Sequence, residues 1–184
     1  LDKRLFVNGV GITSLTPITK MMAHFPLAIL DHTPESALVI CFGMGTTFRS
    51  LASWGIDTTA VELVPSVKEA FPFYFSDASE IMKSPNVHVI VDDGRRFLKR
   101  TTREFDVITL DPPPPIEAAA SSLLYSEEFY ELVKSHLKKD GLLQQWFPSS
   151  DPQTLGAVAG SLISSFPHVR AFTSIENWGT HFIA

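Results

Sequence analysis

A glycine-rich turn at Gly43, Met44 and Gly45 and the carboxylate of Glu62 have the residue types and spacing of a nucleoside site. The turn follows the apolar run 37–42, and Glu62 closes a second apolar run about 20 residues farther on. In a doubly wound sheet, an acid at this distance binds the hydroxyl groups of a ribose. The turn lacks the full G-x-G-x-x-G pattern that holds a dinucleotide pyrophosphate. The pattern therefore favours one unphosphorylated adenosine, as in S-adenosylmethionine or a relative.

Other predicted strands also end in residues that could contact such a ligand. In a parallel α/β sheet, ligands bind outside the carboxyl ends of the strands, so these residues are expected along one rim. Asp111 is the candidate for the reacting centre, because a carboxylate after so apolar a run is costly unless it has partners. The rim residues are Asp92, Asp93 and Gly94 after run 87–91, Asp111 after run 105–110, and Gln145 and Trp146 in run 142–147.

Each of these residues also has a purely structural interpretation. The glycines could serve only a tight turn, and Glu62 could be a solvated strand end. One of Asp92 and Asp93 could cap the next helix while the other meets the adenine amino group. Trp146 fits either a pocket wall or the core.

Alternating strands and helices must position this rim. The pattern predicts a doubly wound, mostly parallel seven-stranded α/β sheet of the S-adenosylmethionine-dependent methyltransferase type, preceded by a short β-hairpin. We expect an N-terminal hairpin and entrance helix over residues 1–30 and a nucleoside-binding domain over 31–184. Pro26 is expected to kink or end the entrance helix. The predicted elements are a hairpin over 5–13; strands 37–42, 58–63, 87–91, 105–110, 142–147, 169–174 and 181–184; and helices 18–30, 46–54, 65–83 (interrupted near Pro72), 95–100, 127–137 and 152–166.

Composition narrows the functional class. The 184 residues carry a formal net charge of −5, which argues against a nucleic-acid partner and suits a cationic substrate. The single cysteine, Cys41, is expected to fill core space. The histidines lack metal-ligand spacing, so no metal site is predicted. No apolar run is long enough to span a membrane. The chain starts without Met and ends on an apolar stretch, so we expect a piece of a longer protein.

Several motifs in order resemble the spermidine synthase family of aminopropyltransferases along nearly the whole chain. The chain is especially similar to the spermidine synthase-like domains that bacteria fuse to membrane segments. Each motif is weak alone, and their joint order is specific. The motifs are NGV at 8–10, LTP at 15–17, MAHFPL at 22–27, GMGTT at 43–47, VEL at 61–63, DDGRRFL at 92–98, YSEEFYEL at 125–132, LKKDG at 137–141, QW at 145–146 and FPH at 166–168.

The resemblance implies a transferase of polyamine biosynthesis that takes decarboxylated S-adenosylmethionine, or S-adenosylmethionine, as co-substrate. Gly43 and Gly45 would lie beside its methionine-derived part, Glu62 would hold the ribose and Asp93 the adenine. Asp111 would orient and help deprotonate an attacking small-molecule amine. It further implies a cytoplasmic domain, with membrane-spanning segments outside the chain and a homodimer as open alternatives. The remaining site residues implied are Met44, Leu63, Asp92 and Gly94 for the nucleoside, and His24, Tyr125, Gln145 and Trp146 for the substrate.

The chain departs from the family where ammonium groups bind. Met44 stands where the family has an aspartate for the aminopropyl ammonium, and Pro114 replaces a second aspartate near the catalytic one. Ile18 and Thr19 replace a tyrosine and a glutamine or histidine, and Ile12 replaces a glutamine. Each lost group would have met a cationic nitrogen, and an unpaired buried ammonium costs several kcal/mol. The acceptor site is therefore expected to be altered.

Two other functions stay open at this stage. Asp111-Pro112-Pro113 is similar to the motif of amino-group methyltransferases, although Pro114 lacks the aromatic ring that would stack on a flipped base. A non-catalytic nucleoside-binding module of a membrane protein is the second alternative. It would keep Glu62 and Asp93 while losing the amine-binding groups.

Overall fold

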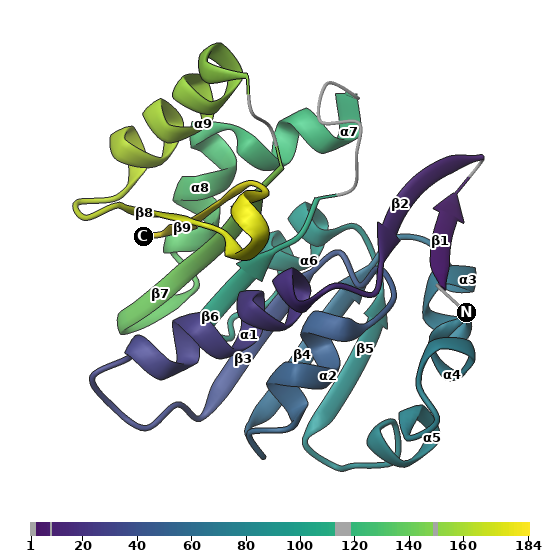
Figure 1. The fold of residues 1–184 in the computed structure, drawn as a ribbon. Coiled ribbons are helices and arrows are strands. Elements are labelled where there is room, and N and C mark those ends of the chain that lie inside the picture. Colours follow the sequence, from purple (N-terminus) through teal and green to yellow (C-terminus); the bar gives the residue numbers. More distant parts are fainter. Residues whose placement is uncertain (1–2, 8, 113–118, 149–150) are drawn as a thin grey trace.

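The computed structural model describes residues 3–7, 9–112, 119–148 and 151–184. A seven-stranded sheet runs through the molecule in the order β5-β4-β3-β6-β7-β9-β8, with β9 antiparallel to both its neighbours and the rest parallel (Figure 1). This is the predicted methyltransferase-type α/β sheet, so the fold class is confirmed. The strands are β3 (Ser36–Ile40), β4 (Asp57–Glu62), β5 (Val87–Val91), β6 (Phe105–Leu110), β7 (Leu137–Phe147), β8 (Arg170–Thr173) and β9 (Thr180–Ile183).

Helices cover both faces of the sheet, which is why its central strands are apolar throughout rather than alternating. In β3, Ala37 and Val39 face one core while Leu38 and Ile40 face the other. The first core is closed by α1 (Pro17–Ile29), α2 (Thr46–Ala52) and the short helices α3 (Pro65–Glu69), α4 (Phe71–Tyr74) and α5 (Ala78–Ile81). The second is closed by α6 (Gly94–Arg100), α8 (Glu127–Lys134) and α9 (Pro152–Ser165).

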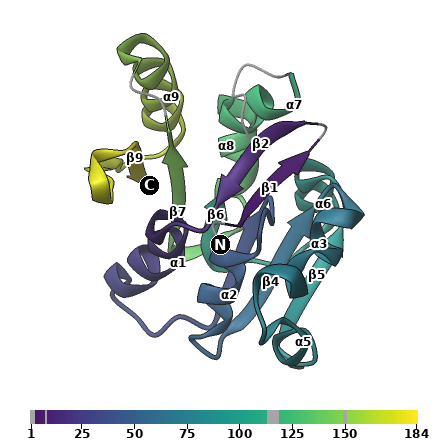
Figure 2. The same ribbon diagram turned by 45° about the vertical axis from the view of Figure 1, so that its right-hand side comes forward.

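The predicted N-terminal hairpin forms a two-stranded sheet of β1 (Arg4–Val7) and β2 (Val10–Ser14). It stands at the same edge of the main sheet as α7 (Ala119–Ser122), which is followed by a 3₁₀ turn at Leu123–Tyr125 (Figure 2). A second 3₁₀ turn, Ile175–Asn177, joins β8 to β9. Leu5 of the hairpin and Leu27 of α1 belong to the same core as β3, so β1 and α1 pack as part of the larger unit.

Pro26 lies inside α1 and does not end it, because its neighbours compensate for the missing N–H. A residue at position 26 would normally donate to the carbonyl of Met22. In this helix the Met22 carbonyl accepts instead from the Thr109 hydroxyl of β6, at 3.1 Å. The helix therefore continues to Ile29.

Two other boundaries differ from the prediction. Strand β7 begins at Leu137, paired with Phe105, and an irregularity in the pairing and a left-handed Asp140 (φ 63°) follow before it runs on to Phe147. Helix α8 therefore ends at Lys134. The expected helix over 65–83 is three short helices, because Pro72 and the extended Phe75 break it.

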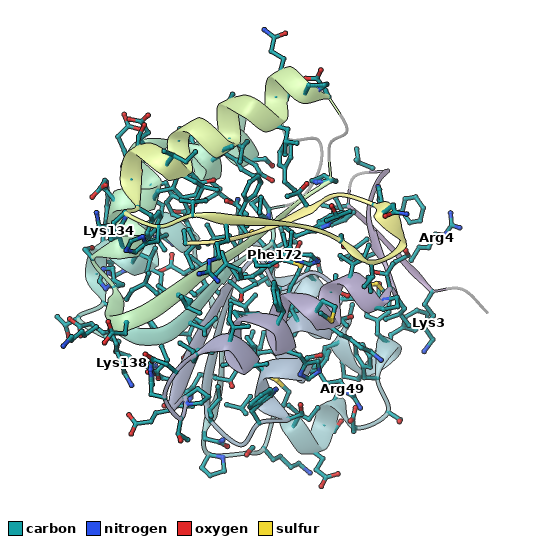
Figure 3. All side chains as sticks on the ribbon, turned by 60° about the vertical axis from the view of Figure 1, so that its left-hand side comes forward. Lys3, Arg4, Arg49, Lys134, Lys138 and Phe172 are labelled. Atoms are coloured by element: carbon teal, nitrogen blue, oxygen red, sulfur yellow. The ribbon has the colours of Figure 1, made fainter. Side chains whose placement is uncertain are left out.

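Asp106 ties three strands together at the amino end of the sheet. Its Oδ2 accepts from the N–H groups of Glu35 and Ser36 at 2.9 and 2.8 Å and from Lys138 Nζ at 2.9 Å, and His32 Nε2 lies 3.0 Å from Oδ1. Figure 3 labels Lys138 at this edge. Burial of Asp106 opposes ionisation, and the combined hydrogen bonds outweigh it, holding the pKa of this carboxyl well below its usual range.

Among the described residues, no helix is both long enough and apolar enough to cross a membrane.

Candidate active site

The glycine turn after β3 is tightly folded at the carboxyl edge of the sheet. Gly43 and Gly45 have φ of 54° and 83°, in the left-handed region where side chains are disfavoured. A Cβ on Gly45 would lie 2.5 Å from the Phe71 ring, so only glycine fits there. Cys41 also adopts a left-handed φ of 73°. The chain therefore reverses sharply just where a ligand would meet the tip of β3.

Glu62 lies at the tip of β4 and is joined to the glycine turn. Its Oε2 accepts from the N–H of Phe42 and its Oε1 from the N–H of Val64, both at 2.9 Å. The side chain is thereby fixed, and each carboxylate oxygen retains a further lone pair for a ligand hydroxyl. Leu63 beside it is 60% exposed, and Val91 at the end of β5 is 43% exposed. These two apolar side chains border the fixed carboxylate.

The two aspartates after β5 have different partners. Asp93 caps α6, its Oδ1 accepting from the N–H of Arg96 at 2.8 Å. Asp92 pairs with the Arg96 guanidinium, which lowers its pKa. A Cβ on Gly94 would lie 2.5 Å from Ile40 Cγ2, so this glycine allows α6 to approach β3. Asp93, to which the resemblance assigns the adenine, is thus also the cap of α6.

The predicted carboxylates gather around the tip of β3. Burial, and then the charges of Glu62, Asp111 and Asp93, raise the pKa of the Cys41 thiol. Hydrogen bonds also tie two of them to the neighbours of Cys41, because Glu62 accepts from the N–H of Phe42 and the Asp111 N–H donates to the Ile40 carbonyl. The structure therefore brings together residues from the ends of β4, β5 and β6.

Asp111, the first residue after β6, is the member of this group whose carboxyl group is unpaired. Its backbone N–H donates to the carbonyl of Ile40 at 3.1 Å, and no hydrogen bond between described residues reaches its carboxylate. Burial without compensation raises its pKa to about 7. A carboxyl group with this pKa can take up a proton near neutral pH, as a general base must.

Tyr125 and Gln145 lie on the face of the sheet covered by α8. The Tyr125 hydroxyl is buried without a partner among the described residues, and burial and the charge of Asp111 raise its pKa. Gln145 Oε1 accepts from the Tyr130 hydroxyl at 2.5 Å, which leaves its Nε2 unpartnered within the described part of the chain. Tyr125 therefore lies within electrostatic reach of Asp111, and Gln145 is held by Tyr130 of α8.

Two residues that the resemblance implies for the substrate have other contacts. Trp146 donates to the Trp178 carbonyl at 3.3 Å, and the two indole rings are 5.2 Å apart, so it holds the turn between β8 and β9. His24 accepts from Trp54 Nε1 at 2.9 Å. Trp54 follows the C-terminal end of α2, whereas the glycine turn precedes its N-terminal end. The structure thus joins His24 to Trp54, and its implied contact with the substrate stays a prediction.

A small chamber of about 10 Å³ adjoins Asp111. Met44 is only 2% exposed and forms part of its wall. Sequence reasoning missed Thr13, Thr46 and Thr47, although Thr46 and Thr47 directly follow the glycine turn and could have been found from it. The chamber is lined by Thr13, Thr19, Phe42, Met44, Thr46, Thr47 and Asp111.

Metal ligands do not cluster in the described part of the chain, where no group of three or more His, Cys, Asp or Glu residues could hold an ion. The residues brought together here are suited to binding a polar nucleoside and to moving a proton.

Comparisons with known proteins show which family the sequence resembles. The model of the spermine/spermidine synthase domain matches residues 16–147. A polyamine aminopropyltransferase of Sulfurisphaera tokodaii is 28% identical over 149 residues, which are 79% of this chain and 50% of that protein. Another, from Leptospira biflexa, is 32% identical over 127 residues, which are 67% of this chain and 44% of that protein. The chain thus spans about half the length of these curated relatives.

Solved structures share the fold. A spermidine synthase in complex with the transition-state analogue AdoDATO superposes with a TM-score of 0.83 at 23% identity, covering 96% of this chain and 64% of that one. Human methyltransferase-like protein 13 in complex with SAH gives a TM-score of 0.67 at 19% identity, covering 91% and 78%. Identities this low establish the fold alone. The family model, which matches well over half of the residues, shows that the chain belongs to the spermine/spermidine synthase domain family.

Proposed function

We propose that this domain is an aminopropyltransferase-like transferase, in which Asp111 accepts the proton of an attacking amine. The observation that carries the proposal is the Asp111 carboxyl, which is partly buried at a strand tip, has no hydrogen-bond partner among the described residues and has its pKa raised to about 7. A base is most effective when its pKa lies near the working pH. A carboxylate with only a structural role would instead have the partners that Asp106 has.

The neighbouring residues support an S-adenosyl nucleoside as co-substrate. Glu62 is held by two backbone N–H groups and offers its remaining lone pairs to ribose hydroxyls. Leu63 and Val91 offer apolar contact to an adenine ring. Asp93 has its Oδ1 occupied by the cap, so its second oxygen would meet the adenine amino group. AdoDATO, the ligand of the similar spermidine synthase, favours the decarboxylated form of the co-substrate.

The reaction would be an in-line displacement. The amine nitrogen forms a bond to the aminopropyl carbon next to the sulfonium as the carbon–sulfur bond breaks. The bonding pair stays on sulfur, neutral methylthioadenosine leaves, and the nitrogen gives one proton to Asp111. The sulfonium is already reactive, so the protein contributes mainly alignment, which can supply roughly 7–11 kcal/mol.

The test is calorimetric titration with methylthioadenosine, decarboxylated S-adenosylmethionine and S-adenosylmethionine, followed by detection of methylthioadenosine release with amines. We expect the decarboxylated form to bind more tightly than the carboxylated one and to be consumed. A preference for S-adenosylmethionine would favour methyl transfer. Binding without consumption would favour a nucleoside-binding module, which the nearly complete burial of Met44 also suits. No binding by folded protein would reject all three.

The cytoplasmic location, the homodimer and the attachment to membrane segments that the resemblance implies stay predictions.

A further inference from the structure

The chamber beside Asp111 is lined by four threonines, two apolar side chains and one carboxylate. Its volume of about 10 Å³ is close to the smallest space that admits one water-sized group. A whole substrate does not fit, but a single nitrogen does. Under the proposed function, on which this inference rests, the atom that must come closest to Asp111 is the attacking nitrogen.

Three of the four threonine hydroxyls have already donated their protons. Thr19 donates to the Thr16 carbonyl and Thr47 to the Thr19 carbonyl, each at 3.0 Å, and Thr13 donates to the Ser14 carbonyl at 3.3 Å. A hydroxyl has one proton and two lone pairs, so these oxygens can only accept from a ligand. The unpaired carboxylate of Asp111 is likewise an acceptor when it is ionised. The chamber therefore suits a group that brings hydrogen-bond donors.

The apolar residues of the chamber, Phe42 and Met44, restrict which chain can be attached to the bound donor group. Phe42 and Met44 are both 2% exposed and offer no strong hydrogen-bonding group. Among the described residues that line the chamber, Asp111 is the one carboxylate. A second ammonium next to these walls would lose its hydration without a counter-charge, whereas an alkyl chain would gain apolar contact.

We propose that this chamber holds the attacking nitrogen of a primary monoamine, with Asp111 accepting one of its two N–H groups and the hydroxyl oxygens of Thr19 and Thr47 sharing the other. The tail that follows the nitrogen is uncharged and contacts Phe42 and Met44. The preferred acceptor class is thus an alkyl monoamine and not a diamine.

The experiment compares n-butylamine with 1,4-diaminobutane, which have the same carbon chain and differ by one amino group. Release of methylthioadenosine from decarboxylated S-adenosylmethionine is followed with each amine. We expect kcat/KM to be at least about tenfold higher for n-butylamine, the factor that one uncompensated polar contact corresponds to. A preference for 1,4-diaminobutane would overturn the proposal.

Variants of Thr19 test the hydroxyl contacts. Thr19→Val removes the oxygen while keeping the shape, and Thr19→Ser is the matched control that keeps it. We expect Thr19→Val to raise the KM for n-butylamine about tenfold with little change in kcat, and Thr19→Ser to restore the wild-type KM. The affinity for methylthioadenosine should be the same in all three proteins. Equal KM values for Val and Ser would contradict the contact. Thr47→Val and Thr47→Ser give an independent pair if a Thr19 variant folds poorly.

A binding measurement separates this proposal from the proposed function. Both amines are titrated into the protein saturated with methylthioadenosine. If no amine is consumed but n-butylamine binds more tightly than 1,4-diaminobutane, and Thr19→Val weakens that binding, the chamber assignment stands and catalysis fails. If neither amine binds and none is consumed, the chamber assignment is wrong.

Discussion

Asp106 and Asp111 lie on the same strand and next to its end, yet they have opposite environments. Asp106, near the start of β6, accepts from two backbone N–H groups and from Lys138. Asp111, just past the end of β6, has no hydrogen bond to its carboxylate from the described residues. The first carboxyl has a pKa well below its usual range, and the second has a pKa of about 7.

The difference shows that an aspartate at one edge of the sheet stabilises the fold, whereas an aspartate at the other edge is available for chemistry. At the amino edge, a carboxylate joins β3, β6 and β7, and its charge is compensated. At the carboxyl edge, the partly buried carboxylate of Asp111 has no partner among the described residues, which costs stability and leaves it able to bind a proton. Partnering therefore distinguishes a structural aspartate from a candidate base within this strand.

Replacing each aspartate by asparagine should give the largest contrast. Asp111→Asn is expected to lower turnover by about 10²- to 10⁴-fold, because the proton acceptor is lost. It should leave the affinity for methylthioadenosine nearly unchanged. Asp106→Asn is the matched control and should keep turnover per folded molecule within a few-fold. Steady-state rates and calorimetry measure both effects, and equal losses in the two variants would erase the contrast.

Stability should show the reverse order. Asp106→Ala removes the acceptor of the Glu35 and Ser36 N–H groups and one of the two carboxylates that Lys138 contacts, so we expect the free energy of unfolding to fall by about 3–5 kcal/mol. Asp111→Asn removes a buried unpaired charge and should stabilise the protein at pH 8, by at most about 4 kcal/mol. Urea denaturation of both variants at pH 8 tests this. A destabilised Asp111→Asn protein would mean that its carboxylate has unseen partners.

The free energy of unfolding, measured as the pH is lowered, distinguishes the contributions of Asp106 and Asp111 from that of the buried His181. His181 is 3% exposed, and burial lowers its pKa to about 4 from an ordinary value of 6.5. The fold thus favours neutral imidazole, so its contribution, up to about 3 kcal/mol, is lost as the pH falls from 6.5 to 4. Asp111 has a raised pKa and acts in the opposite direction between pH 7 and 4. Asp106 has a lowered pKa, so its contribution is lost only below about pH 4.

Removing Asp111 or His181 one at a time should therefore give opposite slopes of the unfolding free energy against pH. In Asp111→Asn, unfolding free energy should fall steeply from pH 6.5 to 4, whereas in His181→Asn it should rise over part of that range. Urea midpoints at pH 7, 5.5 and 4 distinguish the two. Parallel profiles in both variants would show that neither group titrates as described.

The smallest expected effect is on the pH dependence of the rate. Because Asp111 must be ionised to accept a proton, kcat/KM should rise with pH and level off above about pH 7. Between pH 8 and pH 6 the decrease should be about tenfold, as for one group titrating at 7. Asp106→Asn should keep the same inflection. A profile that is flat from pH 5 to 8 would remove Asp111 from the proton transfer.

Much of the fold could be predicted because local patterns determine it. Strands β3, β4 and β6 are buried on both faces, and their apolar runs stand out in the sequence. The helix over 18–30 was expected, but its continuation through Pro26 could not be predicted, since the hydroxyl that satisfies the Met22 carbonyl comes from Thr109, 87 residues away. The early start of β7 likewise depends on pairing with Phe105.

The sequence indicated the carboxylates at the strand ends of the candidate site, but not how the side chains of the chamber beside Asp111 pack. Glu62, Asp93 and Asp111 follow strands, and parallel strands bring their ends to one edge, so their proximity could be expected. Whether Met44 lines or fills the space depends on packing against residues of other elements, which sequence spacing does not encode. His24 lies within a family-like motif, yet its contact is Trp54, from another helical segment.

The sequence by itself determined which side chains stand at the strand tips, because the order of strands and helices places them there. Only the tertiary structure decided that the Asp106 carboxylate has hydrogen-bond partners and that the Asp111 carboxylate has none among the described residues. The partners of Asp106 come from Glu35, Ser36 and Lys138, 71, 70 and 32 residues away. A carboxyl group's charge state follows from what surrounds it in space, and that neighbourhood exists only after the chain has folded.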